Sequence, residues 1–255
     1  MSELRDAIRD WWDADAHHYD GSADHGLSDP VQAAAWNATL RALLPPAPAH
    51  VLDVGAGTGA MSLLAADLGH HVTALDLSAE MLAGARRKAE ERGLELTFLV
   101  GAAEEPPAGP FDAVIERHVA WTLPDPAGAF AAWRNVAPGG RLVLFEGSWP
   151  GEGLSVAVND AVARVLERAW GIAPHHHDDY PPEVLERLPL AGASSPRPFL
   201  EAVTAAGWGA PRLHRLADVE WAVERAARWP LGRLRRRTRY AIVADDRRDS
   251  QTSVR

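Results

Sequence analysis

Residues 51–59 read VLDVGAGTG, a short apolar run that enters a turn containing three glycines. Val51 to Val54 have the composition of a buried strand, and the apolar residues from Ala60 to Leu68 predict a helix after the turn. Glycine lets the backbone of such a turn approach a ligand closely, and the first turn of a helix presents unpaired N–H groups. The stretch therefore predicts a strand, a ligand-binding turn and a helix in succession.

The same alternation of strand and helix continues from residue 49 to residue 150. Short runs rich in Val and Leu are separated by helical stretches, and we expect each run to be a strand: HVLDVGAG (50–57), HVTALDLS (71–78), LTFLVGAA (96–103), FDAVIER (111–117) and RLVLFEGS (141–148). Such runs are typical of a parallel sheet that helices cover on both faces. The predicted fold class is α/β, with a Rossmann-like, doubly wound and mostly parallel sheet.

The segments on either side of residues 49–150 have different patterns. Residues 1–48 are predicted to be helical, with Trp11, Trp12 and Trp36 among their apolar anchors, and they end in the helix-breaking run PPAPAH. Residues 151–192 are predicted to be a helical insertion after the fifth strand. Residues 193–245 complete the same domain with a strand in TRYAIVA (238–244), and the polar residues 246–255 are expected to form a disordered tail.

Composition excludes several classes of function. The 255 residues contain no cysteine, which excludes disulfides, thiolate metal sites and cysteine nucleophiles. The formal net charge of −9 argues against a nucleic-acid partner, and we interpret the basic run RLRRRTRY (233–240) as a solvated helix end or an edge strand. Because there is neither a signal-peptide pattern nor an apolar run of about 18 residues, we expect a cytoplasmic protein without a membrane segment.

Two acids accompany the glycine turn. Asp76 ends the second predicted strand, where an acid pairs with ribose hydroxyls in nucleotide-binding sheets. Dinucleotide sites space their glycines as G-x-G-x-x-G. Here Gly55, Gly57 and Gly59 are spaced as G-x-G-x-G, and Asp53 stands two residues before the first of them. The spacing disfavours an NAD-dependent oxidoreductase, which is one alternative, and favours S-adenosylmethionine.

On these residues the chain resembles the class I S-adenosylmethionine-dependent methyltransferases, and within them the ubiquinone and menaquinone methyltransferase group. The segments LSAEML (77–82), where Ser78 is expected to cap a helix, and VAPGGRL (136–142) extend the resemblance. The resemblance implies S-adenosylmethionine as cofactor, residues 1–48 as a lid and residues 151–192 as an acceptor-binding insertion. It also implies a set of cofactor-binding residues, namely Asp53, Gly55, Gly57, Gly59, Asp76, Leu77, Ala103 and Arg117.

The sequence departs from the family pattern at one position. Many relatives have an Asp that accepts a hydrogen bond from the adenine amino group where this chain has Ala102. We expect the backbone around Ala103, or the side chain of Glu104, to take that place.

The stretch DAVIERHVAWTLPDP (112–126) places polar residues at the end of the fourth predicted strand. Ligands of open α/β sheets lie beyond the carboxyl ends of the strands, so we expect His118 to face the cofactor cleft, with Arg117 beside it. An imidazole is suited to act as a base near neutral pH, which methyl transfer requires when the acceptor must lose a proton. A solvent-facing His118 and a salt-bridged Arg117 remain the alternatives.

The acceptor site is predicted from the resemblance as well. A tyrosine in the N-terminal segment of related enzymes reaches the methionyl end of the cofactor, and Tyr19 matches it as a second catalytic residue. Trp121, His175 and Tyr180 are the expected acceptor-lining residues. Consecutive histidines such as those of HHHDDY (175–180) point in diverging directions, whereas metal ligands must converge, so no metal is expected.

The pair formed by Tyr19 and the pattern Arg-His-x-x-Trp (117–121) is similar to bacterial indole carbon methyltransferases. It implies a small, partly apolar acceptor, with carbon 3 of the indole in a tryptophan-derived specialised metabolite, such as a cyclic dipeptide, as the first hypothesis. Methylation of oxygen on a phenol or quinone-type acceptor is the alternative. A non-methylating, cofactor-binding protein on the same scaffold is a further one.

Overall fold

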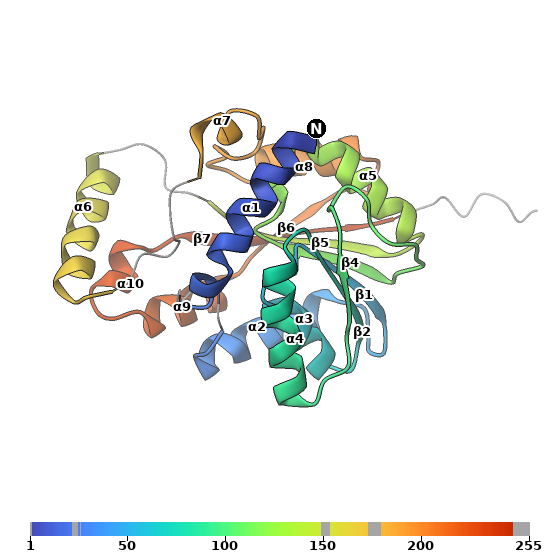
Figure 1. Ribbon diagram of the computed structural model, residues 1–255, viewed down its shortest axis with the longest axis horizontal. Coiled ribbons are helices and arrows are strands. Elements are labelled where there is room, and N and C mark those ends of the chain that lie inside the picture. Colours follow the sequence, from blue (N-terminus) through green and yellow to red (C-terminus); the bar gives the residue numbers. More distant parts are fainter. Residues whose placement is uncertain (1, 22–24, 26, 149–153, 173–179, 247–255) are drawn as a thin grey trace, which may run out of the picture.

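The computed structural model describes the chain except for residues 1, 22–24, 26, 149–153, 173–179 and 247–255. Within the described residues a seven-stranded sheet has the order β3-β2-β1-β4-β5-β7-β6 (Figure 1). The strands are β1 (His50–Val54), β2 (His71–Asp76), β3 (Thr97–Val100), β4 (Ala113–Arg117), β5 (Arg141–Ser148), β6 (Arg212–Arg215) and β7 (Thr238–Asp245). Neighbours among β1 to β5 pair in parallel, and β7 runs antiparallel to β5 and β6. The predicted fold class is confirmed.

Helices cover both faces of the sheet. Their bounds are α1 (Ser2–Tyr19), α2 (Pro30–Leu43), α3 (Ala60–Asp67), α4 (Ala79–Arg92), α5 (Pro126–Val136), α6 (Leu154–Ala169), α7 (Pro182–Leu185), α8 (Arg197–Ala205), α9 (Ala217–Ala226) and α10 (Leu231–Leu234), with a 3₁₀ turn at Ala120–Thr122. Buried residues of α5 and α8 pack on one face, and those of α2, α3 and α9 pack on the other. The strands are apolar on both sides because both sides are covered.

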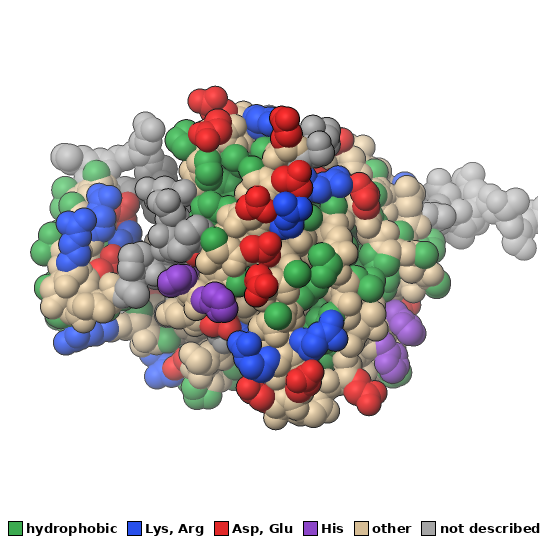
Figure 2. Space-filling view, viewed as in Figure 1, with side chains coloured by type: hydrophobic (Ala, Val, Ile, Leu, Met, Phe, Trp, Pro, Cys, Tyr) green, Lys and Arg blue, Asp and Glu red, His purple; other side chains and the backbone are tan. Residues whose placement is uncertain are grey.

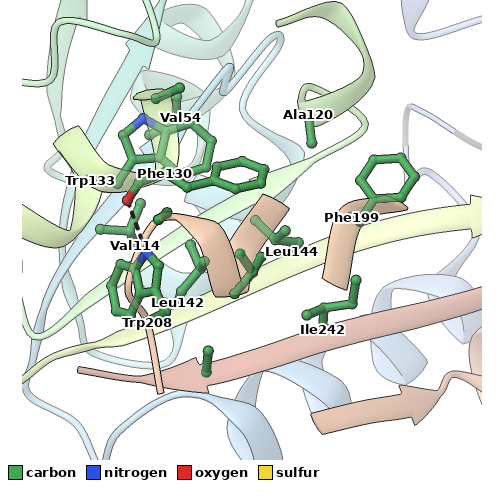
Figure 3. Packing of buried hydrophobic residues seen from close by; sticks show 14 of the residues in the cluster. Val54, Val114, Ala120, Phe130, Trp133, Leu142, Leu144, Phe199, Trp208 and Ile242 are labelled. Atoms are coloured by element: carbon green, nitrogen blue, oxygen red, sulfur yellow. Dashed lines mark hydrogen bonds between the residues drawn. The ribbon is translucent and has the colours of Figure 1, made fainter. Parts of the chain in front are cut away.

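Large aromatic side chains fix the face that carries α5. Phe130 and Trp133 of α5 are completely buried, with ring centroids 5.0 Å apart. Trp208 lies under them and donates a hydrogen bond of 2.9 Å from its indole Nε1 to the carbonyl oxygen of Phe130 (Figure 3). Burial of one such side chain stabilises a fold by about 1.5–3 kcal/mol. This packing holds α5, and with it the segment that joins β4 to α5, against the sheet.

Local capping explains where α4 begins and ends. The hydroxyl of Ser78 accepts a hydrogen bond of 3.0 Å from the backbone N–H of Met81, which confirms the predicted cap. At the other end Gly93 adopts a left-handed backbone with φ of 64°, which glycine allows without strain. The cap is thereby fixed two residues after Asp76, and α4 begins at the next residue, close to the carboxyl end of β2.

The basic run 233–240 is not an edge strand. It spans the end of α10 and the start of β7, which lies between β5 and β6. Its arginines also have acidic neighbours: Arg235 pairs with Glu167 at 2.8 Å, and Arg233 approaches Glu224 at 3.7 Å. The edge-strand interpretation is therefore wrong, because β6, for which the sequence has no apolar pattern, adds a further strand outside β7.

The described part of the chain includes the first residue of the expected tail. Asp246 is buried, and its carboxylate accepts hydrogen bonds of 2.7 Å from Arg134 Nε and 3.0 Å from the backbone N–H of Gly139. Residues 247–255 of that predicted tail lie outside the described residues. None of the described helices combines the length and apolarity needed to cross a membrane.

Residues 151–192 include two helices that lie apart from each other. α6 stands away from the sheet at the left of Figure 1, beside α10, whereas α7 lies next to α1. α1 itself also contacts α4. α1 thus contacts both α4 and α7, whereas α6 contacts α10.

Candidate active site

The carboxyl ends of β1, β2, β3 and β4 open into one cavity that α1 covers. Its empty volume is about 820 Å³ including the open mouth, and small-molecule sites span about 300–1,000 Å³. α1 contributes Arg5, Ile8, Trp12 and Tyr19. The strand ends and the segments that follow them contribute Gly55, Gly57, Asp76, Leu77, Met81, Gly101, Ala103, Glu104, Arg117, His118, Val119, Thr122, Leu123 and Pro124. The cavity thus lies where the sequence places the cofactor.

Asp76 holds the glycine turn in shape. One carboxylate oxygen accepts a hydrogen bond of 2.7 Å from the backbone N–H of Gly57, and the other accepts one of 2.8 Å from Ser78. Burial raises the pKa of Asp76 to about 6, against the opposing effect of these N–H donors. The group is therefore mainly a carboxylate at neutral pH, as an acceptor for ribose hydroxyls must be.

The glycines of the turn differ in what they face. Gly55 and Gly57 have φ of 63° and 54° and line the cavity. Gly59, with φ of 85°, packs against α4, because a Cβ there would lie 2.9 Å from the Cβ of Ala85. The structure therefore does not bring Gly59 to the cavity wall.

Asp53 also lies behind the wall. Its carboxylate is 1% exposed and accepts a hydrogen bond of 2.5 Å from the Ser62 hydroxyl of α3. Burial raises the pKa of Asp53 to about 7, although the Ser62 hydroxyl and the Arg117 guanidinium oppose the shift. Asp53 thus ties β1 to the helix after the turn.

The wall formed by the segments after β2 and β3 has apolar residues and one acid. Leu77 and Ala103 both line the cavity. The carbonyl oxygen of Ala103 accepts a hydrogen bond of 2.6 Å from Trp133 Nε1, so part of its accepting capacity is used within the protein. Glu104, next in the chain, lines the cavity with a carboxyl group.

His118 sits at the end of β4 in an unusual conformation. Its φ of 63° is rare for a residue with a side chain, and its backbone N–H donates a hydrogen bond of 3.1 Å to Phe145 of β5. The imidazole lines the cavity, with Nδ1 3.4 Å from Oε2 of Glu146. Burial lowers the pKa of His118 well below its usual value, and the nearby Arg117 and Arg239 add to the shift. The ring is therefore neutral at neutral pH.

Tyr19 and Arg117 lie in the same cavity as His118. The Tyr19 ring stacks on His25 with centroids 4.1 Å apart, and Arg117 donates a hydrogen bond of 3.2 Å to the carbonyl oxygen of His25. Burial raises the pKa of Tyr19, and the Arg117 guanidinium opposes that shift. The arrangement brings together the two predicted catalytic residues and the predicted cleft-lining arginine.

The other predicted acceptor residues form an aromatic cluster behind the cavity. Tyr180 lies 5.4 Å from Trp121 and 6.2 Å from Trp12, measured between ring centroids. Trp12 reaches the cavity wall, whereas Trp121 and Tyr180 pack behind it with Leu4 and other apolar residues between α1 and α7. His175 lies outside the described residues. Among the described residues no group of acids and histidines converges as metal ligands do.

Sequence reasoning missed Glu146. The rule that selected His118, a polar residue at the carboxyl end of a buried strand, applies equally to the acid in RLVLFEGS, because β5 is the neighbour of β4. The lining residues Arg5 and Ile8 had no comparable signal, since their positions depend on how α1 docks.

Comparisons with known proteins agree with this geometry. A family model described as a methyltransferase domain matches residues 52–144. The ubiquinone biosynthesis O-methyltransferase of Xanthomonas axonopodis pv. citri (strain 306) is 35% identical over 190 residues, which cover 71% of this chain and 74% of that protein. The geranyl diphosphate C-methyltransferase of Streptomyces coelicolor A3(2), whose structure contains S-adenosyl-L-homocysteine, superposes with a TM-score of 0.62 at 17% identity, covering 95% of this chain and 98% of the other.

A [4+2]-cyclase also shares the fold, with a TM-score of 0.56 and 18% identity over 82% of this chain and 80% of the other. Likeness of fold alone therefore does not decide the reaction. The sheet and its glycine turn define a Rossmann-like protein that binds a nucleoside cofactor at its strand ends. The chain belongs to the class I S-adenosylmethionine-dependent methyltransferases, in the group that includes the ubiquinone biosynthesis enzymes.

The cofactor is S-adenosylmethionine, as expected, and the enzyme transfers a methyl group to a small-molecule acceptor. The residues at the cavity fit this cofactor. Gly55 and Gly57 present backbone at the cavity wall in left-handed conformations, and a Cβ at Gly57 would meet no atom closer than 3.7 Å. Asp76 offers carboxylate oxygens for a ribose, and Leu77 offers an apolar surface for the adenine.

Proposed function

We propose that the enzyme methylates a proton-bearing aromatic acceptor and that His118 removes the acceptor's proton. The observation that carries this proposal is the His118 imidazole at the wall of the cofactor cavity, with Nδ1 3.4 Å from Oε2 of the buried Glu146. Burial lowers the pKa of this imidazole, which favours its neutral form. A base of this kind accelerates proton removal by about 10²- to 10⁴-fold.

When bound, the cofactor supplies the methyl group at its sulfonium centre. We assign its ribose to Asp76, the floor beneath its methionyl part to Gly55 and Gly57, and its methionyl end to Tyr19 and Arg117. We place Leu77 and Ala103 beside the adenine of the cofactor. Asp53 and Gly59 lie behind the cavity wall and act by shaping the glycine turn. His118 accepts the proton that the acceptor loses as the new bond forms.

α1 is the lid in this proposal. Hydrogen bonds to the cofactor loops support the assignment: the carboxylate of Asp13 in α1 accepts from the Ser78 hydroxyl at 2.5 Å, and that of Asp20, the residue after α1, accepts from the Thr58 hydroxyl at 2.6 Å. Figure 2 shows the same face, where acidic and basic side chains gather along the course of α1. A covered cavity excludes water from the reacting groups.

An indole ring is the first acceptor that we propose. The aromatic side chain of Trp12 at the cavity, backed by Trp121 and Tyr180, supports a flat aromatic ligand. Attack by carbon 3 of an indole turns its N–H into an acidic iminium N–H, so a base of low pKa suffices to remove the proton. Cyclic dipeptides that contain tryptophan belong to this class.

A phenol or quinol oxygen is the second acceptor. The observation that favours it is the 35% identity to ubiquinone biosynthesis O-methyltransferases over most of both chains. A phenolic hydroxyl also loses its proton during methylation, so the same imidazole serves it.

A panel of acceptors tests the proposal. The purified enzyme is incubated with S-adenosylmethionine and with indoles, phenols or tryptophan-containing cyclic dipeptides, and the products are analysed by mass spectrometry and NMR. We expect a gain of one methyl group, on an indole carbon or a phenolic oxygen, together with release of S-adenosylhomocysteine. Cofactor binding without transfer to any of these acceptors would contradict the proposal and favour a non-methylating role.

A further inference from the structure

Three polar side chains lie buried together on one face of the sheet, next to His118. Glu116 of β4 and Glu146 of β5 are 0% and 2% exposed, and Tyr240 of β7, which pairs with Glu146, is 2% exposed. The register pairs Glu116 with Leu144, so the two glutamates project from the same face of adjacent strands. Isolated carboxylates are unfavourable at such depth unless something compensates their charge.

Some polar atoms of Glu116, Glu146 and Tyr240 have hydrogen-bond partners and others do not. Oε2 of Glu116 accepts from the backbone N–H groups of Val119 and Ala120 at 2.8 and 3.1 Å. Oε2 of Glu146 lies 3.4 Å from Nδ1 of His118. Among the residues that the structure describes, Oε1 of each glutamate and the hydroxyl of Tyr240 have no hydrogen-bond partner. Each carboxyl group therefore has one oxygen engaged and one available.

Like charges in one buried site favour the uptake of a proton. Burial raises the pKa of Glu146 well above its usual value, and the negative charge of Glu116 adds to the effect. Burial likewise raises the pKa of Glu116, against its two backbone donors. Two buried carboxyl groups whose charges interact lose their protons in separate steps, so the pair retains one proton over a range of pH.

Cationic groups face His118 from the other directions. Arg117 belongs to its own strand end, Arg237 and Arg239 lie at the start of β7, and His25 belongs to the connection between α1 and α2. These charges disfavour an imidazolium. Negative charge that could offset these cationic groups therefore has to come from Glu146, on the remaining side of the imidazole.

We propose that Glu116 and Glu146 hold one proton between their Oε1 atoms, and that Oε2 of Glu146 accepts the Nδ1–H of His118. Glu146 is then a positioning residue that fixes the tautomer of His118 and leaves Nε2 with its lone pair toward the cavity. This inference rests on the proposed function for its catalytic meaning.

The proton balance of the step is simple. A bond forms between the acceptor's carbon or oxygen and the methyl carbon, while the bond from the methyl carbon to the sulfonium sulfur breaks and leaves its electron pair on sulfur. The acceptor's N–H or O–H bond also breaks, and the proton passes to Nε2 of His118. The Nδ1–H stays with Glu146, and the single negative charge of the glutamate pair balances the imidazolium. After the product leaves, Nε2 releases its proton to water.

The test measures the tautomer of His118 by ¹⁵N NMR in the full-length enzyme saturated with S-adenosylhomocysteine. The His118 signal is assigned from its loss in His118→Gln. We expect protonated Nδ1 and unprotonated Nε2 in the wild type at neutral pH. A wild-type ring protonated at Nε2 overturns the proposal, and this result does not depend on any acceptor.

Variants separate the two parts of the inference. Glu146→Leu removes the acceptor at similar volume, so we expect loss of the Nδ1–H tautomer, a fall in kcat of at least about 100-fold and little change in the KM for S-adenosylmethionine. Glu146→Gln supplies an amide N–H in place of the shared proton, so it keeps the tautomer and loses less than about tenfold in kcat. Glu90→Gln, an exposed change on α4, is the matched control.

Each outcome bears on one claim. Retention of the tautomer and rate in Glu146→Leu overturns the positioning role, and a Glu146→Gln enzyme as slow as Glu146→Leu overturns the shared proton. Circular dichroism and affinity for S-adenosylhomocysteine report whether each variant folds. If Glu146→Leu does not fold, the positioning role is tested by the His118 tautomer in the wild type and in Glu146→Gln. Both are expected to carry the proton on Nδ1, and a proton on Nε2 in either overturns the role. A fully active His118→Ala enzyme refutes the proposed base while leaving the tautomer measurement to stand alone.

Discussion

Gly55 and Gly93 have nearly the same left-handed backbone, with φ of 63° and 64°, but different surroundings. A Cβ at Gly55 would lie 2.0 Å from Cγ2 of Val119, whereas a Cβ at Gly93 would meet no atom within 4 Å. Val119 follows His118 directly in the chain. Gly55 therefore allows the turn after β1 to contact the segment that carries the candidate base.

This difference makes a matched pair of substitutions. Gly93→Ala adds a Cβ in a left-handed conformation alone, which lowers the free energy of unfolding by about 1–2 kcal/mol. Gly55→Ala adds the clash with Val119 as well, so we expect a further loss of about 1–3 kcal/mol and weaker binding of S-adenosylmethionine. Urea unfolding and cofactor titration measure both effects. Equal losses in the two variants, with cofactor affinity intact, would show that the contact is unimportant.

Single residues also show where sequence reasoning reaches its limit. The expectation that polar residues at strand ends face the ligand correctly predicted that His118 and Arg117 lie at the cavity. It succeeded because the apolar runs show where each parallel strand ends. It did not separate Gly57, at the wall, from Asp53, which lies behind it, since that distinction depends on how α3 packs. It also omitted Glu146, whose position becomes meaningful only when β5 is known to lie beside β4.

At the scale of elements, polar contacts join α1 and the residue that follows it, Asp20, to the cofactor loops and to α4. Asp20 accepts from Thr58 of the glycine loop and pairs with Lys88 of α4 at 2.7 Å. Asp13 binds Ser78, and Arg5 pairs with Glu105 at 3.0 Å. Because α1 also lines the cavity, these contacts tie the lid to the loops that would hold the cofactor.

Loosening one of these contacts should speed cofactor exchange. Asp20→Ala removes a hydrogen bond worth about 1 kcal/mol and a partly exposed ion pair worth up to about 1 kcal/mol. A loss of 1–2 kcal/mol corresponds to roughly 5- to 30-fold faster release of S-adenosylmethionine, measured by stopped-flow displacement. Asp10→Ala, whose carboxylate pairs with Arg9 within α1, is the control and should leave the rate unchanged. Equal release rates in both variants would argue against a lid.

The elements differ in how far the sequence predicts them. β1 to β5 follow from short apolar runs, since a strand buried on both faces has few polar positions. β6 was not predicted, because Arg212–Arg215 is exposed at every position and lies at the sheet edge, where packing does not select apolar residues. The docking of α1 was implied by the family and not by any pattern in its own residues.

At the scale of the whole molecule, one cavity unites elements from distant parts of the chain. Tyr19 comes from α1, Gly55 follows β1, Asp76 ends β2 and His118 follows β4. The parallel sheet brings these positions together, because its carboxyl ends share one edge. The fold thus explains why the cofactor site and the proposed base, His118, share one covered cavity.

Replacement of His118 is the most direct test of that account. Formation of S-adenosylhomocysteine is measured at neutral pH for the wild type and His118→Ala, with the acceptor that the panel identifies, alongside the affinity of each for S-adenosylmethionine. A proton-removing imidazole predicts a loss of turnover of at least about 100-fold with cofactor affinity preserved, because we assign the ribose and methionyl contacts to other residues. Full activity in His118→Ala would contradict the central claim.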